Sequence, residues 1–205
     1  MTIKEACVGS FIEAKSAYQK GADRIELCTN LTEGGTTPSY GTIAMTVKNI
    51  TIPVLVIIRP RGGNFVYSKE EIDIMLEDIE ICKKLGVHGV VIGALTPEGR
   101  VDEVYTKILI SKAKPMQITY HMAFDELENQ ELALEQLVNL GVDRILTKGC
   151  KTCASDGRER IKKLVDLAGD RITIIAGGGV TADNYEELIN HTKVHEVHGT
   201  KIVGI

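Results

Sequence analysis

One type of junction recurs along the chain and limits the folds that it can adopt. In each copy, a glycine that can close a helix is followed by an aliphatic and β-branched run: KGADRIEL from residue 20, LGVHGVVI from 85 and LGVDRILT from 140. Helix starts are marked as well, because Ser10 with Glu13 and Ser68 with Glu71 have the S-x-x-E spacing of a capping box. These signals predict a regular alternation of helices and strands.

The alternation extends over the whole sequence. We predict strands at 3–8, 24–28, 54–59, 89–93, 116–121, 143–147, 171–176 and 195–199. We predict helices at 11–20, 40–49, 69–85, 102–113, 129–140, 157–168 and 182–191. Strictly alternating elements imply parallel strands with right-handed crossovers, and eight such strands suit closure into a TIM-type (β/α)₈ barrel. An open, doubly wound α/β sheet is the alternative.

The length of 205 residues fits a single barrel domain over residues 1–205. The last predicted strand is followed at once by the final residues, so we expect the barrel to lack its final helix. The open flank would expose apolar surface on the neighbouring helices. We therefore expect a second copy of the chain to cover it, giving a homo-oligomer and most simply a dimer.

Composition excludes several classes of partner. The net charge is -4 and no lysine or arginine cluster is present, which argues against nucleic acid. No apolar run approaches the roughly 18 residues of a membrane span, and the start MTIKEACVGS lacks the hydrophobic region of a secretory signal. We therefore predict a cytoplasmic protein without a membrane partner. The 5 cysteines are then expected to be thiols, ligands or nucleophiles rather than disulfides.

Polar side chains share one parity on the predicted strands. Side chains of one parity point into a barrel, and functional groups gather at the carboxyl ends of its strands. The inward positions of five strands carry Glu5 and Cys7, Glu26 and Cys28, Arg59 and Arg61, Thr119 and His121, and Glu196 and His198. A buried carboxylate without a partner costs several kcal/mol, so packing alone would not select this set. The barrel mouth is therefore predicted to be a chemical site.

Cysteines provide the candidate metal ligands. Cys7 and Cys28 end adjacent parallel strands, about 4.8 Å apart in backbone spacing, so their sulfurs could share one soft ion such as Cu(I). Alternatively, the two thiols pack as small apolar groups or form a disulfide under oxidising conditions. Cys150 and Cys153 form CKTC, a spacing suited to a metal or redox pair, or to an exposed pair without function.

A second hypothesis is an enzyme that acts on a small anionic metabolite, either phosphorylated or carboxylated. Glu26, His121 and Asp125 could supply general acid and base groups, and Arg59 and Arg61 could bind the anion by bidentate contacts. The sequence alone does not choose between an enzyme and a metal-binding protein. The structural alternative is a buried ion pair in which Glu26 and Arg59 satisfy each other.

A glycine cluster follows the seventh predicted strand. Gly177, Gly178 and Gly179 lead into a helix that we expect Thr181 to cap, and free backbone donors at such a helix start can bind phosphate. The glycines could equally provide a tight turn and close packing. We group them with His198 as candidate substrate-binding residues.

Two further segments are predicted to lie near the barrel mouth. The loop at 29–41 is longer than a simple connection requires, and we expect it to fold over the mouth and shield Cys28. Lys148 ends the sixth predicted strand, where an inward lysine could form a Schiff base. A solvated loop lysine is the alternative that we favour.

Several stretches spread over nearly the whole chain match one known family: EACVGS (5–10), GADRIELC (21–28), EGGTTPSYG (33–41), IRPRGGNFVYS (58–68), YHMAFD (120–125), GVDRILTKG (141–149), AGGGV (176–180) and EVHGTK (196–201). In them the sequence resembles the CutC family of copper homeostasis proteins. The resemblance implies a cytoplasmic TIM-barrel protein associated with copper handling. Cys7 and Cys28 occupy the positions of cysteines proposed in that family to bind Cu(I). Asn64 departs from the pattern, since the family usually has Asp there.

Overall fold

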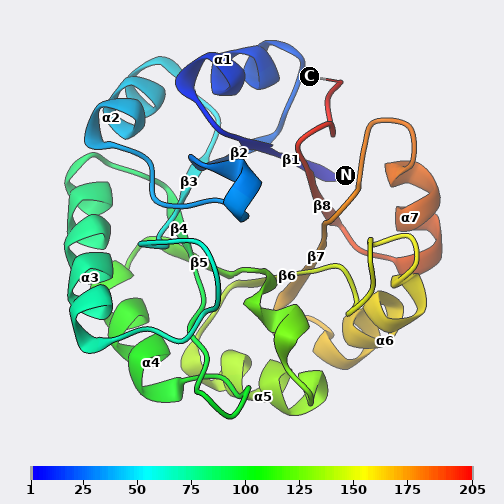
Figure 1. Cartoon of the computed structure of the whole chain (residues 1–205). Coiled ribbons are helices and arrows are strands. Elements are labelled where there is room, and N and C mark those ends of the chain that lie inside the picture. Colours follow the sequence, from blue (N-terminus) through cyan, green and yellow to red (C-terminus); the bar gives the residue numbers. More distant parts are fainter. Residues whose placement is uncertain (1, 205) are drawn as a thin grey trace.

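The computed structural model describes residues 2–204, in which eight parallel strands form a closed barrel inside a ring of seven α-helices (Figure 1). The strands are β1 (Ile3–Val8), β2 (Arg24–Leu27), β3 (Val54–Ile57), β4 (Gly89–Ile92), β5 (Gln117–Tyr120), β6 (Arg144–Thr147), β7 (Thr173–Ala176) and β8 (Glu196–Gly199). They pair in chain order, and β8 pairs with β1. The predicted TIM-type barrel is confirmed, and the open sheet is wrong.

The helices lie close to their predicted positions. They are α1 (Phe11–Gln19), α2 (Tyr40–Asn49), α3 (Lys69–Lys84), α4 (Glu103–Ala113), α5 (Gln130–Leu140), α6 (Arg158–Ala168) and α7 (Tyr185–Thr192). Ser68 and Glu71 form the predicted capping box at α3, and Gly141 ends α5 at a φ of 80°. Two short 3₁₀ helices, η1 (Leu31–Glu33) and η2 (Met122–Glu126), follow β2 and β5.

The start of α7 differs from the prediction. The helix begins at Tyr185 rather than at 182, and its N-cap is Asn184 instead of Thr181. Thr181 forms an isolated bridge with Lys201, and its backbone N–H donates to the Asn184 side chain at 2.8 Å. The bridge keeps the chain extended beyond β7, so the helix starts only after a further turn.

Two apolar clusters divide the interior. Outward side chains of the strands, such as Val8, Ile25 and Val56, belong to the main core between the sheet and the helices. A smaller cluster inside the barrel contains Leu55 and Ile57 of β3, Val91 of β4 and Cys28, the residue after β2. The inward positions of β1, β2 and β8 instead carry charged side chains, so the barrel interior has one apolar side and one polar side.

No helix follows β8 within residues 2–204, as predicted. The expected apolar flank is largely absent, however, because Ile202 turns back into the main core and Lys20 Nζ donates to the Gly204 carbonyl at 2.5 Å. Of the two flanking helices, α7 has no large exposed apolar side chain among the described residues, and α1 exposes Ile12. None of the described helices combines the length and apolar character needed to cross a membrane.

Candidate functional site

A cavity of about 240 Å³ opens at the carboxyl ends of the strands. The polar part of its wall comprises Cys7, Glu26, Cys28, Arg59, His121, His198 and Thr200, and Gly178 and Gly179 also line it. The structure therefore brings eight of the predicted site residues together. Arg61, Asp125 and Gly177 are not part of the wall.

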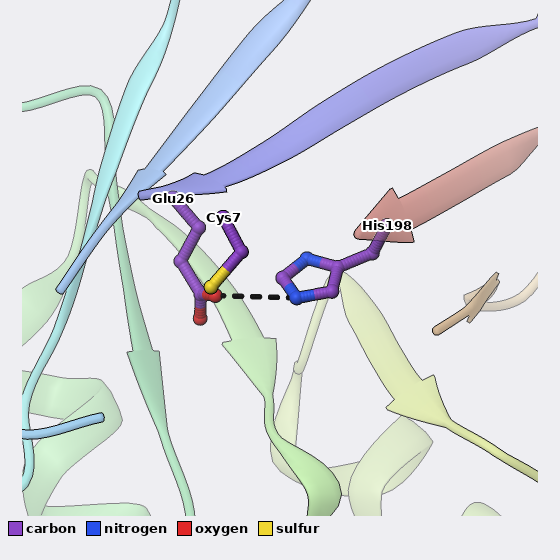
Figure 2. Close-up of side chains that lie close together, drawn as sticks. All are labelled: Cys7, Glu26 and His198. Carbon is purple, nitrogen blue, oxygen red and sulfur yellow. Dashed lines mark ion pairs between the residues drawn. The ribbon is translucent and has the colours of Figure 1, made fainter. Parts of the chain in front are cut away.

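Three side chains from neighbouring strands form the most compact polar group of the site. Cys7 lies on β1, Glu26 on β2 and His198 on β8, and Cys7 is directly opposite Glu26 in the sheet register. Figure 2 shows the three side chains pointing toward one another, and one ligand atom from each residue lies within 4.8 Å of the other two. His198 Nε2 is 3.5 Å from a Glu26 carboxylate oxygen. These atoms could together contact a single metal ion.

A second sulfur lies beside this group. The Sγ atoms of Cys7 and Cys28 are 3.9 Å apart, and both cysteines are free thiols. Cys28 is only 1% exposed. Gly35 lies in the loop after β2, and a Cβ atom added there would be 3.4 Å from the Cys28 sulfur. This loop therefore covers the thiol, as expected. The Cys7 sulfur therefore belongs both to a sulfur pair and to the group with Glu26 and His198.

A buried carboxylate orients His198. Glu5 Oε1 is 2.8 Å from His198 Nδ1, and the other Glu5 oxygen accepts from Arg24 Nε at 2.5 Å. Arg24 also pairs with Glu196. A carboxylate on one ring nitrogen fixes the imidazole and raises the basicity of the other, an arrangement common behind metal-binding histidines. Glu5 therefore directs His198 Nε2 towards the candidate metal site.

Arg24 was not predicted as a site residue, although its position on β2 indicates an inward side chain. Its position is inward by parity, two residues before Glu26, at the amino end of β2. Arg144 on β6 is inward by the same rule, and its Nε lies 3.2 Å from a Glu196 oxygen. The two arginines and Glu196 form a charged layer beneath the mouth, and of these three residues only Glu196 was predicted to point inward.

The protonation states of Glu5 and His198 follow from their environment. Burial alone would raise the pKa of Glu5, but the Arg24 guanidinium and His198 outweigh it and hold the pKa at about 2. Burial would lower the pKa of His198, whereas the surrounding acidic groups, first Glu26, raise it well above its usual value. Glu5 is therefore ionised and His198 favours its charged form.

The two sulfurs differ in their preferred state. A hydrogen bond from the Cys28 thiol lowers the pKa of Cys7, with further help from His198, while burial opposes the shift. The same contact and burial raise the pKa of Cys28. Burial raises the pKa of Glu26, and the negative charge on Cys7 adds to it. The site therefore favours a Cys7 thiolate beside a protonated Cys28, and metal binding would displace the remaining protons.

Arg59 lies just after β3 and is 4% exposed. Its guanidinium donates to the carbonyl oxygens of Glu33 at 2.7 Å, Gly35 at 2.9 Å and Gly63 at 2.7 Å. These bonds hold the loop after β2 over the mouth. The alternative of a Glu26–Arg59 ion pair is wrong, because Glu26 pairs with a histidine and Arg59 has no ion pair with the described carboxylates.

Arg61 and Asp125 lie outside the cavity. Arg61 Nε is 2.5 Å from Glu71 Oε1, which places its guanidinium against the start of α3. The Asp125 carboxylate accepts from Thr147 Oγ1 at 2.6 Å and from the Lys148 backbone N–H at 2.9 Å. Both groups already have partners in the protein, and they position loops around the mouth.

The remaining candidates also stay away from the cavity wall. Cys150 is exposed, Cys153 is half-buried, and neither residue lines the cavity. Lys148 is half-buried and is likewise not part of the wall. A Cβ atom on Gly177 would lie 2.6 Å from Leu146 Cδ1 and 3.1 Å from His198 Cδ2. Gly177 therefore provides the close packing that His198 requires.

The predicted phosphate site required a helix start directly after the glycines, and the structure does not place one there. Gly178 and Gly179 line the cavity and have φ values of 88° and 76°, which glycine adopts readily. The next helix begins only at Tyr185, so no helix N-terminus follows these glycines directly. Their positive φ values suit a tight turn, and substrate binding by Gly178 and Gly179 stays a prediction.

His121 is held in one orientation on the opposite side of the cavity. Its Nδ1 accepts from the Ala123 backbone N–H at 3.2 Å, and its ring centroid is 4.8 Å from that of Phe65. Burial, with the nearby Arg59 charge, lowers the pKa of His121 to about 3. The imidazole is therefore neutral near pH 7, which favours hydrogen bonding over the acid–base role predicted for it.

Substitution of Gly93 by alanine should disturb this ring. A Cβ atom there would lie 2.4 Å from His121 Cε1, so the imidazole would have to move. We expect Gly93→Ala to lower the free energy of unfolding by about 1–3 kcal/mol, the usual cost of overpacking. Urea denaturation provides the measurement.

Gly41 in α2 is the matched control, because a Cβ atom there meets nothing within 4 Å. Gly41→Ala should leave stability unchanged or raise it by up to about 1 kcal/mol. Equal effects of the two substitutions would contradict the tight fit at His121.

Comparisons with known proteins cover nearly the whole chain. The model of the CutC family matches residues 2–203. A CutC family protein from Enterococcus faecalis is 48% identical over 208 residues, which cover 98% of this chain and 100% of the relative. A protein named copper homeostasis protein cutC homolog from Homo sapiens is 43% identical over 96% of this chain and 72% of its own length.

Solved structures agree in fold. The crystal structure of CutC from Streptococcus agalactiae superimposes with a TM-score of 0.94 at 39% identity, covering 98% of this chain and all of that one. An aldolase, QR15, has a TM-score of 0.75 at 13% identity over 99% of this chain and 91% of its own. At that identity, the second likeness shows the barrel fold alone.

Proposed function

The chain belongs to the CutC family, and on this basis we propose that it is a copper homeostasis protein that binds Cu(I) at its barrel mouth. The ligands are the sulfurs of Cys7 and Cys28, and the ion is cargo. The observation that carries the proposal is the Sγ–Sγ distance of 3.9 Å. Two metal–sulfur bonds of about 2.3 Å each would span up to about 4.6 Å, so one ion can contact both sulfurs. Thiolates also favour Cu(I) over harder cations.

His198 supplies a third ligand. With both sulfurs bound, the estimated bond lengths give a bent arrangement that leaves room for another donor atom. His198 Nε2 lies within 4.8 Å of the Cys7 sulfur, and Glu5 orients the ring from behind. Glu26 completes the group with a carboxylate, a harder ligand that Cu(I) uses less readily. It would serve to balance charge beside the ion.

Thiol protection in the unmodified protein tests the site. Cys7 is half-buried and lines the cavity, whereas Cys150 is exposed outside it. We expect one equivalent of Cu(I), added anaerobically, to slow alkylation of Cys7 by iodoacetamide. Cys150 should react at the same rate with and without copper, as peptide mass spectrometry would record. Protection of Cys150 with unchanged reactivity of Cys7 would place the copper elsewhere.

The proposed setting is the cytoplasm, where the glutathione pool keeps such thiols reduced. We also propose a homodimer. It is supported by exposed apolar side chains on α4 and α5, two helices that contact each other, namely Val104, Ile108 and Leu132. Light scattering coupled to size-exclusion chromatography measures the assembly. A mass equal to one chain at micromolar concentration would contradict the dimer.

A further inference from the structure

The cavity contains a buried positive charge that the protein does not neutralise. Arg59 lines the wall, yet its hydrogen bonds go to three backbone carbonyls, and it has no ion pair within residues 2–204. Glu26 is the one carboxylate in the described wall, and its partner is His198. Burying a charge without a counter-charge is costly, so an anion in this cavity would be stabilised.

His121 adds an unused donor beside this charge. Its Nδ1 accepts the Ala123 backbone N–H, so in the neutral ring the proton is on Nε2. That Nε2 atom is buried and has no hydrogen-bond partner, and the same is true of Arg59 Nε. Phe65 contacts both groups, with Arg59 Cζ and the His121 ring each 4.8 Å from its centroid. Buried polar groups without partners are uncommon in native proteins, and a bound water, ion or ligand is one way in which they are satisfied.

We propose that the mouth cavity binds a small organic carboxylate, with its negative charge beside Arg59 and one oxygen accepting the Nε2–H of His121. Leu31, Ile57 and Leu146 form an apolar wall for the carbon skeleton. A volume of about 240 Å³ corresponds to roughly eight water molecules at about 30 Å³ each, which limits the ligand to about ten non-hydrogen atoms. The apolar wall favours an organic anion over inorganic phosphate.

Binding requires a small adjustment of the wall. The His121 Nε2 atom has almost no exposed surface, so the atoms that cover it must move before a ligand can reach it. Met122 lines the cavity next to His121 and has a flexible, unbranched side chain that can move. The charge of Arg59 attracts the anion without such a movement.

The carboxylate site does not depend on copper. Its two polar groups follow β3 and β5, whereas the proposed copper ligands lie at β1, β2 and β8. Replacement of both cysteines by serine should therefore abolish copper binding and preserve carboxylate binding. Loss of both in that variant would overturn the placement of the carboxylate at Arg59 and His121.

A matched set of probes tests the proposal. Pyruvate, butyrate and benzoate are each compared with the corresponding neutral amide, and with inorganic phosphate, by thermal shift and isothermal titration calorimetry. At least one carboxylate should bind, and at least tenfold more tightly than its amide. Binding of phosphate alone, equal binding of acid and amide, or no binding of any carboxylate at 20 mM, roughly the weak limit for so small a ligand, would overturn the proposal.

Two arginine variants locate the site. Arg59→Gln should weaken the binding of that carboxylate at least tenfold, whereas Arg61→Gln, outside the cavity, should leave it unchanged. Equal losses in both variants would overturn the assignment. Nitrogen-15 spectra of the unmodified protein give a readout that does not depend on a variant folding: His121 should carry its proton on Nε2, and the carboxylate should shift that signal. A proton on Nδ1, or no shift at saturation, would exclude His121 as the donor.

Discussion

Replacement of Cys7 by serine is expected to weaken Cu(I) binding by at least about a hundredfold. Loss of a residue that only orients a metal ligand usually lowers metal affinity by about 10–100-fold, and Cys7 would contact the ion itself. The Cys7 sulfur is 3.9 Å from that of Cys28 and also belongs to the group with Glu26 and His198. A serine hydroxyl is harder and does not ionise near neutral pH, so it cannot replace the thiolate. Anaerobic titration against a competing Cu(I) chelator measures the effect.

Two further cysteine variants distinguish the proposed copper site from the other thiols of the protein. Cys28→Ser leaves Cys7 and His198 in place, so it should weaken binding by less than Cys7→Ser. Cys150→Ser is the control, because this thiol is exposed and outside the cavity. Unchanged affinity in Cys7→Ser, together with a loss in Cys150→Ser, would show that the copper site proposed at the mouth is wrong.

The second large effect concerns stability. Glu5→Gln is expected to lower the free energy of unfolding by about 3–5 kcal/mol, because it leaves the buried charges of Arg24 and His198 without their shared counter-charge. Glu5 is 1% exposed, so water cannot take its place. Glu135→Gln is the matched control, since Glu135 pairs with Arg171 on the surface and such pairs contribute about 0–1 kcal/mol. Equal losses in the two variants would contradict the role of the buried network.

The same carboxylate predicts how stability depends on pH. Its pKa is about 2 in the folded protein, against an ordinary value of 4.5. A lowered pKa stabilises the folded state above the unfolded value, and this contribution is lost as pH falls from about 4.5 through about 2. Urea denaturation across this range should show a steeper loss of stability in the unmodified protein than in Glu5→Gln. Parallel curves would mean that Glu5 does not titrate as described.

The barrel could be predicted because local signals repeat in every unit. Glycines such as Gly141 close the helices, and the aliphatic run that follows each one becomes a strand. The start of α7 was wrong because a contact distant in sequence decides it, the bridge between Thr181 and Lys201. Local capping signals at Thr181 contain no information about that partner.

Strand parity predicted much of the mouth but not the pairing within it. It identified Cys7, Glu26 and His198 as inward residues, which the structure places within 4.8 Å of one another. It failed for Arg61, because β3 already ends at Ile57 and the following loop turns the side chain away. Parity describes only continuous strands, and the partner of each charge depends on the stagger between strands, which the sequence does not specify.

We propose that sulfur and nitrogen atoms from separate strands meet around one ion at the barrel mouth. X-ray absorption spectroscopy of the protein loaded with one equivalent of Cu(I) tests it most directly. We predict a copper environment dominated by two sulfur atoms, which disappears when Cys7 and Cys28 are both replaced by serine. A spectrum with only nitrogen and oxygen neighbours, or one unchanged in the double variant, would contradict the claim.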